Sequence, residues 1–177
     1  MTSQLLVPNI DVRRSDTRAR TELEWLDARH SFNFNWNRQT GNSNFGLLLV
    51  NNHDLIQPGT GFETHPHQDM EIVTWILQGG VEHMDSDGHS GVSVPGEAQR
   101  MSAGRGIWHS EMNGSPETPL RLVQMWVVPD ETKLAPSYEQ SDITRELKAG
   151  ELVAVASGKG LAGAMKIHQK HATLWAA

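Results

Sequence analysis

The chain contains no cysteine, and this absence excludes both disulfides and thiolate metal sites. Any bound metal must therefore use imidazole, carboxylate or water as its ligands. No apolar run approaches the roughly 20 residues that a membrane span needs, and the first residues lack the basic stretch and apolar segment of a secretory signal. Like charges never gather into a block, and the formal net charge is −6. We therefore expect a cytoplasmic protein that binds neither a membrane nor nucleic acid directly.

One group of basic residues stands out near the N-terminus. Its members are Arg13, Arg14, Arg18 and Arg20, and acidic residues lie between or after them. Such a mixture of charges is typical of a solvated segment, so residues 1–30 are predicted to form an N-terminal arm. The 177 residues are enough for one substantial domain with its own core and too few for two of full size.

Helix signals are scarce, whereas short apolar runs punctuated by glycine and proline are common. Runs rich in β-branched and aromatic residues between turn signals are typical of antiparallel strands. The predicted strands cover residues 45–50, 72–77, 81–85, 91–94, 99–101, 107–109 and 120–129. A short helix or turn is expected at 141–147, with further strands at 151–156 and 165–167. The pattern predicts an all-β barrel or sandwich over residues 32–129.

Two short segments each offer a pair of metal-ligand side chains at positions i and i+2. They are Thr64-His65-Pro66-His67 and Trp108-His109-Ser110-Glu111. Residues at i and i+2 of a strand point to the same face, so two such strands could present three imidazoles and a carboxylate to one metal ion. This donor set suits Fe(II), with Mn, Ni, Co or Cu as alternatives. Zinc is also possible but more often takes a closed four-coordinate site.

Other residues compete for a place in this site or have simpler explanations. Glu71 lies four residues after His67, so on alternation alone it shares the ligand face and rivals Glu111 as the carboxylate ligand. His83 and His89 flank a predicted turn and are expected to face solvent. The remaining histidines are not expected to be ligands. His30 and His53 lack a partner at useful spacing, and the i, i+3 spacing of His168 and His171 would suit a helix, whereas the surrounding residues favour a strand.

Segments 61–74 and 104–112 resemble the two metal-binding motifs of the pirin family of the cupin superfamily, and 81–86 and 138–140 resemble further signatures of that family. The resemblance implies a cupin β-barrel, a double-stranded β-helix of jelly-roll type, at residues 31–135. It implies His65, His67, His109 and Glu111 as ligands, and thus prefers Glu111 to Glu71. Pirins have two barrels, so residues 136–177 are expected to be a linker and the partial start of a second. Residues 151–177 are expected to pack on the first barrel or to pair with a second copy of the chain.

The resemblance also implies two kinds of function. Some pirin-like proteins are quercetin 2,3-dioxygenases, which open the central ring of a flavonol with release of carbon monoxide; Glu111 would then be the catalytic residue that accepts the hydroxyl proton. Others are non-enzymatic iron-binding co-regulators of transcription or partners of other proteins. A small aromatic substrate requires a pocket of several hundred Å³ beside the metal, whereas a regulatory protein does not.

Overall fold

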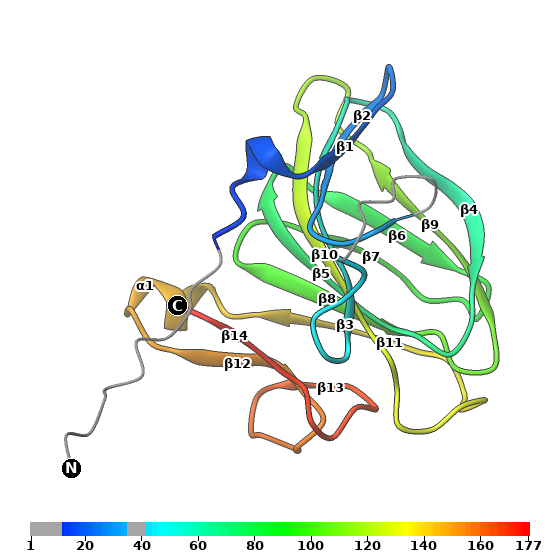
Figure 1. Cartoon of the computed structure of the whole chain (residues 1–177), viewed down its shortest axis with the longest axis vertical. Helices are drawn as coiled ribbons and strands as arrows, with labels where there is room; N and C mark the ends of the chain where they lie inside the picture. The colour runs from blue at the N-terminus through cyan, green and yellow to red at the C-terminus, as the bar shows by residue number, and fades with distance from the viewer. Residues whose placement is uncertain (1–11, 35–41) are drawn as a thin grey trace, which may run out of the picture.

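Two antiparallel β-sheets form the body of the protein in the computed structural model, which describes residues 12–34 and 42–177 (Figure 1). One sheet has seven strands in the order β1-β2-β3-β10-β5-β8-β11, and the other has four in the order β4-β9-β6-β7. Their bounds are β1 Ala19–Glu22, β2 Leu26–His30, β3 Leu48–Ile56, β4 Gly61–His67, β5 Glu71–Gln78, β6 Val81–Asp85, β7 Ser90–Ser93, β8 Glu97–Ser102, β9 Ile107–Asn113, β10 Leu120–Val127 and β11 Ser137–Asp142. The sheets are not closed into a continuous barrel, and this arrangement fits the expected all-β cupin jelly roll.

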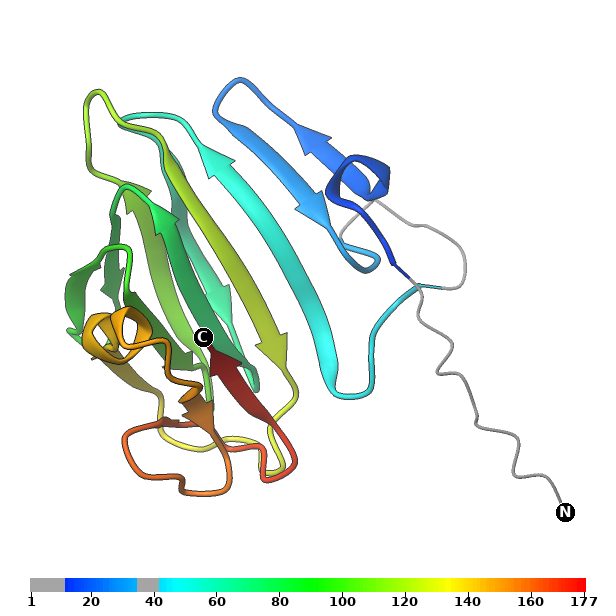
Figure 2. The same cartoon turned by 90° about the vertical axis from the view of Figure 1, so that its left-hand side faces the viewer.

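The C-terminal segment lies against the outer face of the seven-stranded sheet (Figure 2). It contains the helix α1 (Thr144–Lys148) and a small sheet of β12 (Val153–Ser157), β13 (Met165–Lys166) and β14 (Thr173–Ala176). Val155 and Met165 pack in one buried cluster with Val73 and Ala98 of the larger sheet. Residues 151–177 therefore pack on the first domain, which is one of the two arrangements expected for them; association with a second copy stays a prediction.

The inner face of the seven-stranded sheet carries a row of polar side chains. Because directly paired residues of antiparallel strands share a face, the register brings five of them side by side across the sheet: His30, Asn52, Gln124, Thr74 and Gln99. The neighbouring row is Ala28, Asp54, Leu122 and Ile76, in which Asp54 is the one polar member. The interior thus has an apolar core at one end and a polar band beside it.

Three sequence-based expectations differ from the structure. Residues 19–30 form a β-hairpin rather than a solvated arm, because Leu26, Ala28 and His30 alternate inward. The strand predicted at 45–50 begins only at Leu48 and continues to Ile56, because Asn52 and Asp54, whose residue types are rare in strands, lie inside it. Residues 137–142 form β11 beside β8, and α1 starts later than expected.

The domain boundaries placed at residues 30 and 135 stay predictions, although strand pairing crosses both of them. β2 pairs with β3 across the first boundary, and β8 pairs with β11 across the second. Within residues 12–34 and 42–177, no helix is long and apolar enough to cross a membrane.

Candidate metal centre

Two adjacent antiparallel strands, β4 and β9, carry the four predicted ligands. His65 is the direct cross-strand partner of His109, and Glu111 is the partner of Phe62. The ring centroids of His65 and His109 are 4.5 Å apart, and His67 lies 4.9 Å from His65 and 5.0 Å from His109. One ring nitrogen of each imidazole lies within 4.8 Å of one in each of the other two. The i, i+2 spacing therefore brings the three imidazoles to one point, whereas Glu111 falls outside this group among the described residues. The four-ligand set stays a prediction.

A bulge in β4 places an apolar side chain beside these histidines. The register shifts between Phe62 and His65, so that two residues of β4 oppose Ser110 of β9. Three residues apart in a regular strand, Phe62 and His65 would face opposite sides. With the extra residue, both line the same cavity, and their ring centroids are 6.3 Å apart.

The ring nitrogens of these histidines have the hydrogen-bond pattern that metal ligands need. His65 Nδ1 lies 2.7 Å from the carbonyl oxygen of Glu63 and must donate to it, so Nε2 keeps its lone pair. Both ring nitrogens of His109 are buried without a hydrogen-bond partner among the described residues. An unpaired buried polar atom costs about 1–3 kcal/mol, and a bound divalent cation would satisfy one of these nitrogens. The donor set thus fits a divalent transition metal.

Burial keeps two of the imidazoles neutral. It lowers the pKa of His109 to about 3, with the neighbouring charges of His65 and His83 acting in the same direction. Burial likewise lowers the pKa of His67 to about 4, with contributions from His109 and His65. A neutral imidazole has the lone pair that coordination requires, so both side chains are competent ligands at neutral pH.

The carboxylate of Glu111 is held by three donors from the facing sheet. Oε1 accepts from Gln99 Nε2 at 2.7 Å and from Thr74 Oγ1 at 3.2 Å, and Oε2 accepts from Gln124 Nε2 at 2.7 Å. An ionised carboxylate has about four acceptor positions, so three donors leave about one free. Glu111 therefore keeps room for a metal ion or for a proton while its orientation is fixed.

His83 does not face solvent, and the expectation that it does is wrong. It points inward from β6 opposite Glu111, is 2% exposed, and stacks on Tyr138 with ring centroids 4.2 Å apart. Strand alternation turned it inward despite the turn that follows. His83, His109 and Glu111 form a second group whose possible ligand atoms lie within 4.8 Å of one another. Because His109 belongs to both groups, the site offers two neighbouring candidate positions for a cation. His89, the other histidine expected to face solvent, is half-buried and forms a hydrogen bond with Asp85.

Glu71 lies away from both groups of possible ligands among the described residues. It is on the outer face of the seven-stranded sheet, where its Oε2 accepts a hydrogen bond from Ser102 Oγ at 2.7 Å. Burial raises the pKa of Glu71, and the backbone of His168 contributes a hydrogen bond that opposes this rise. The turn between β4 and β5 breaks the alternation that had placed Glu71 beside His67.

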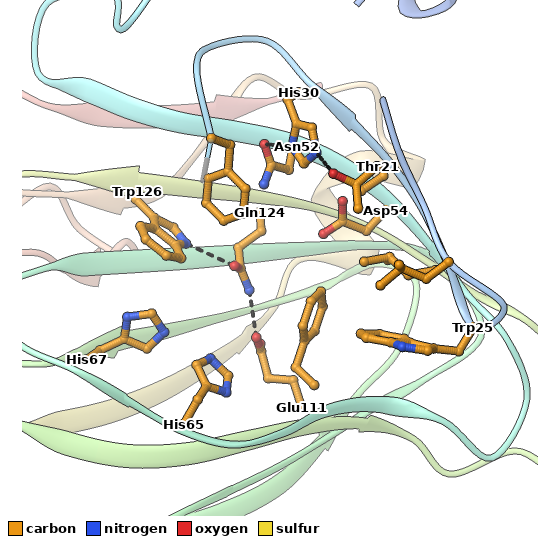
Figure 3. A pocket seen from close by; sticks show the side chains of 15 residues that line it. Thr21, Trp25, His30, Asn52, Asp54, His65, His67, Glu111, Gln124 and Trp126 are labelled. Carbon is orange, nitrogen blue, oxygen red and sulfur yellow. Dashed lines mark hydrogen bonds between the residues drawn. The ribbon is translucent and has the colours of Figure 1, made fainter. Parts of the chain in front are cut away.

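A cavity of about 320 Å³ opens beside the histidines (Figure 3). Glu111, His65 and His67 lie at one end of it, and aromatic side chains from two strands and from two segments outside the strands form much of the wall. These aromatic residues are Trp25, Phe34, Phe62 and Trp126. A volume of this size and a mostly apolar wall are typical of sites for small organic molecules.

The opposite end of the cavity is polar, and the sequence-based reasoning missed it. Thr21, His30, Asn52 and Asp54 lie there, on the hairpin β1–β2 and on β3. Burial and the charge of Glu111 raise the pKa of Asp54 to about 7. The sequence carries no clear signal for this polar set, because four polar residues follow one another from Asn51 to Asp54 without the apolar alternation that indicates a half-buried strand.

Replacing Gln124 by alanine should weaken metal binding without unfolding the protein. The substitution removes the donor to Glu111 Oε2 and the acceptor of the Trp126 indole N–H, which is 2.9 Å from Gln124 Oε1. Loss of a partner that orients a ligand typically costs about 10- to 100-fold in metal affinity. Titration with Ni²⁺ or Fe²⁺ measures this effect, with the exposed Gln78→Ala as a matched control. Equal affinities in the two variants would contradict the orienting role.

Comparison with known proteins agrees with the fold. The family model described as Pirin matches residues 12–127. A Mycobacterium tuberculosis protein named "Putative quercetin 2,3-dioxygenase" is 50% identical over 170 residues, which are 96% of this chain and 70% of that protein. The Escherichia coli protein named quercetin 2,3-dioxygenase is 41% identical over 160 residues, which are 90% of this chain and 68% of that protein.

A solved structure is similar over the same region. The crystal structure of the bacterial pirin YhhW from Escherichia coli in complex with nickel(II) has a TM-score of 0.83 and 40% identity, covering 89% of this chain and 67% of that one. The chain thus spans about two thirds of the length of the relatives that it matches. With the family model covering most of the described residues, the chain belongs to the pirin family.

Proposed function

We propose that the chain carries the active site of a metal-dependent dioxygenase of the quercetin 2,3-dioxygenase type, with Fe(II) as the metal and a small flavonol-like aromatic as the substrate. The cavity of about 320 Å³ beside His65, His67 and Glu111 is the observation that supports an enzyme most strongly. A regulatory protein that only senses iron would need the metal ligands but no enclosed aromatic pocket. The names of the relatives point to the same activity.

Each part of the site has a role in this proposal. His65, His67, His109 and Glu111 would hold the metal, and when bound it supplies Lewis acidity and redox chemistry with dioxygen. Glu111 accepts the proton of the substrate hydroxyl, since Thr74, Gln99 and Gln124 fix its carboxylate at the cavity wall. Four aromatic residues of the cavity wall orient the substrate ring and exclude water: Trp25, Phe34, Phe62 and Trp126.

Iron-loaded protein should consume quercetin in air and release carbon monoxide. His65→Ala, which removes a ligand, should lose this activity, and His171→Ala, which changes an exposed histidine, should keep it. Flavonol absorbance and carbon monoxide detection follow the reaction, and a sample without dioxygen is the blank. A folded, iron-loaded sample that does not turn over quercetin would reject the enzymatic proposal and favour the iron-binding regulatory alternative.

The cytoplasmic location and an association of two copies through the C-terminal segment also stay predictions. Light scattering measures the second of these directly, and a monomer at all concentrations would contradict it.

A further inference from the structure

Asp54 is a buried carboxylate that lacks a partner for one of its oxygens. Asp54 is 2% exposed, and its Oδ1 forms no hydrogen bond with any part of the chain that the structure describes. It stands in a row with Ala28, Leu122 and Ile76, so nothing beside it in the sheet can pair with it. An unpaired polar group inside a protein is costly, and its persistence in an apolar row suggests a ligand that pairs with it.

The direction of the side chain supports this reading. Asp54 lines the cavity at the end away from the histidines, and Figure 3 shows its carboxylate directed toward the interior of the cavity. Figure 3 shows Gln124 and Glu111 between the two polar ends, with Trp126 beside His67 and Trp25 on the side of Asp54. An elongated aromatic molecule in this cavity could therefore reach from the histidines to Asp54.

Asn52 supplies a donor at the same end. Its Oδ1 can only accept, so His30 Nδ1 donates to it over 2.9 Å. The other nitrogen of His30 is 2.8 Å from Thr21 Oγ1, and in the neutral imidazole it accepts that hydroxyl proton. Burial lowers the pKa of His30, which is consistent with the neutral ring. The hydrogen bonds from Thr21 to His30 and from His30 to Asn52 fix the Asn52 amide with its nitrogen on the cavity side (Figure 3).

We propose that Asp54 is the second anchor of the cavity and accepts a hydrogen bond from a hydroxyl of a polyhydroxylated aromatic ligand whose other end lies at the histidines. Asn52 Nδ2 donates to an oxygen of the same ligand. The ligand class rests on the proposed function, whereas the anchor itself rests on the burial and orientation of Asp54. Asp54 thereby selects among aromatic ligands by their hydroxyls remote from the metal.

Two probes test the anchor without turnover. Quercetin and 3-hydroxyflavone share the 3-hydroxyl and 4-carbonyl groups, but 3-hydroxyflavone lacks the hydroxyls on the outer rings. Nickel-loaded protein without dioxygen is titrated with each, and quenching of tryptophan fluorescence reports binding because Trp25 and Trp126 line the cavity. The variants are Asp54→Leu, which matches the apolar row, and Asp54→Asn, which keeps the size. Asp87→Asn is the exposed control.

The parent protein and Asp87→Asn should prefer quercetin. Above pH 8, where Asp54 is ionised because its pKa is about 7, Asp54→Leu should lower the preference for quercetin by about 10- to 100-fold, the range for a hydrogen bond to a charged group. It should bind 3-hydroxyflavone at least as well as the parent does. Asp54→Asn should show a smaller loss, and it decides the matter if Asp54→Leu does not fold. An unchanged preference in the Asp54 variants, a parent protein without any preference, or no binding of either probe would each overturn the anchor.

The two proposals fail separately. A preference that depends on Asp54 in a protein that never turns over quercetin would support the anchor and reject the dioxygenase. Turnover of quercetin with a preference independent of Asp54 would reject the anchor alone.

Discussion

Replacing His109 by alanine should reduce metal affinity by more than about 100-fold, the upper range for the loss of a residue that only orients a ligand. His109 belongs to both groups of possible ligand atoms, so its loss breaks either position that the cation could take. Both of its ring nitrogens are buried and have no partner in the part of the chain that the structure describes, so alanine removes them without leaving an unpaired polar group behind. Metal content after purification without added metal, followed by Ni²⁺ titration, measures the effect.

Two further variants show which position the metal takes. His65→Ala removes a ligand from the group with His67, whereas His83→Ala removes one from the group with Glu111. We expect His65→Ala to lose metal and His83→Ala to retain most of it. The reverse outcome would place the cation at the second position, and stoichiometric metal in His109→Ala would refute both. His171→Ala serves as the exposed control.

Acid should destabilise the metal-free protein through two of the same histidines. Their pKa values are lowered in the folded state, to about 4 for His67 and about 3 for His109, from about 6.5 in the unfolded chain. The unfolded state therefore binds more protons below pH 6.5, and stability falls as the pH falls toward 4. Each of the two imidazoles should account for a loss of about 3 kcal/mol between pH 6.5 and pH 4.

Urea unfolding at several pH values after metal removal tests this expectation, with the double variant His67→Gln, His109→Gln as the comparison. Asp54 acts in the opposite sense, because its pKa is raised to about 7 and the folded state holds a proton that the unfolded chain releases. The difference between parent and double variant isolates the histidines, since Asp54 is present in both. Parallel stability profiles for the two proteins would contradict the prediction.

The convergence of the three imidazoles could be predicted from the sequence for a physical reason, whereas their role as metal ligands stays a prediction. His65 with His67, and His109 with Glu111, are two residues apart on their strands, and strand alternation fixes such pairs to one face whatever the rest of the fold does. The all-β character followed from turn residues between short apolar runs. Local rules of this kind operate over a few residues and need no tertiary information.

What could not be predicted depends on interruptions of alternation and on distant partners. The bulge after Phe62 and the turn before Glu71 each change which face a side chain takes, and neither has a clear signature in the sequence. The turn beside His83 favours solvent exposure, whereas the residue that it faces, Glu111, lies on another strand that the local sequence does not reveal. Asp54 was missed because its environment is made by β2 and β10, far away along the chain.

The hydrogen bonds of Glu111 have a consequence for motion. Glu111 belongs to β9 of the smaller sheet, and its three donors belong to β5, β8 and β10 of the larger sheet, so one carboxylate fastens the two halves of the sandwich together. Any breathing of the sandwich that separates the sheets must also release this carboxylate. The contact between the two sheets and the orientation of Glu111 are therefore lost in the same motion. Amide protons of β9 and β10 would then exchange with solvent through a shared opening event.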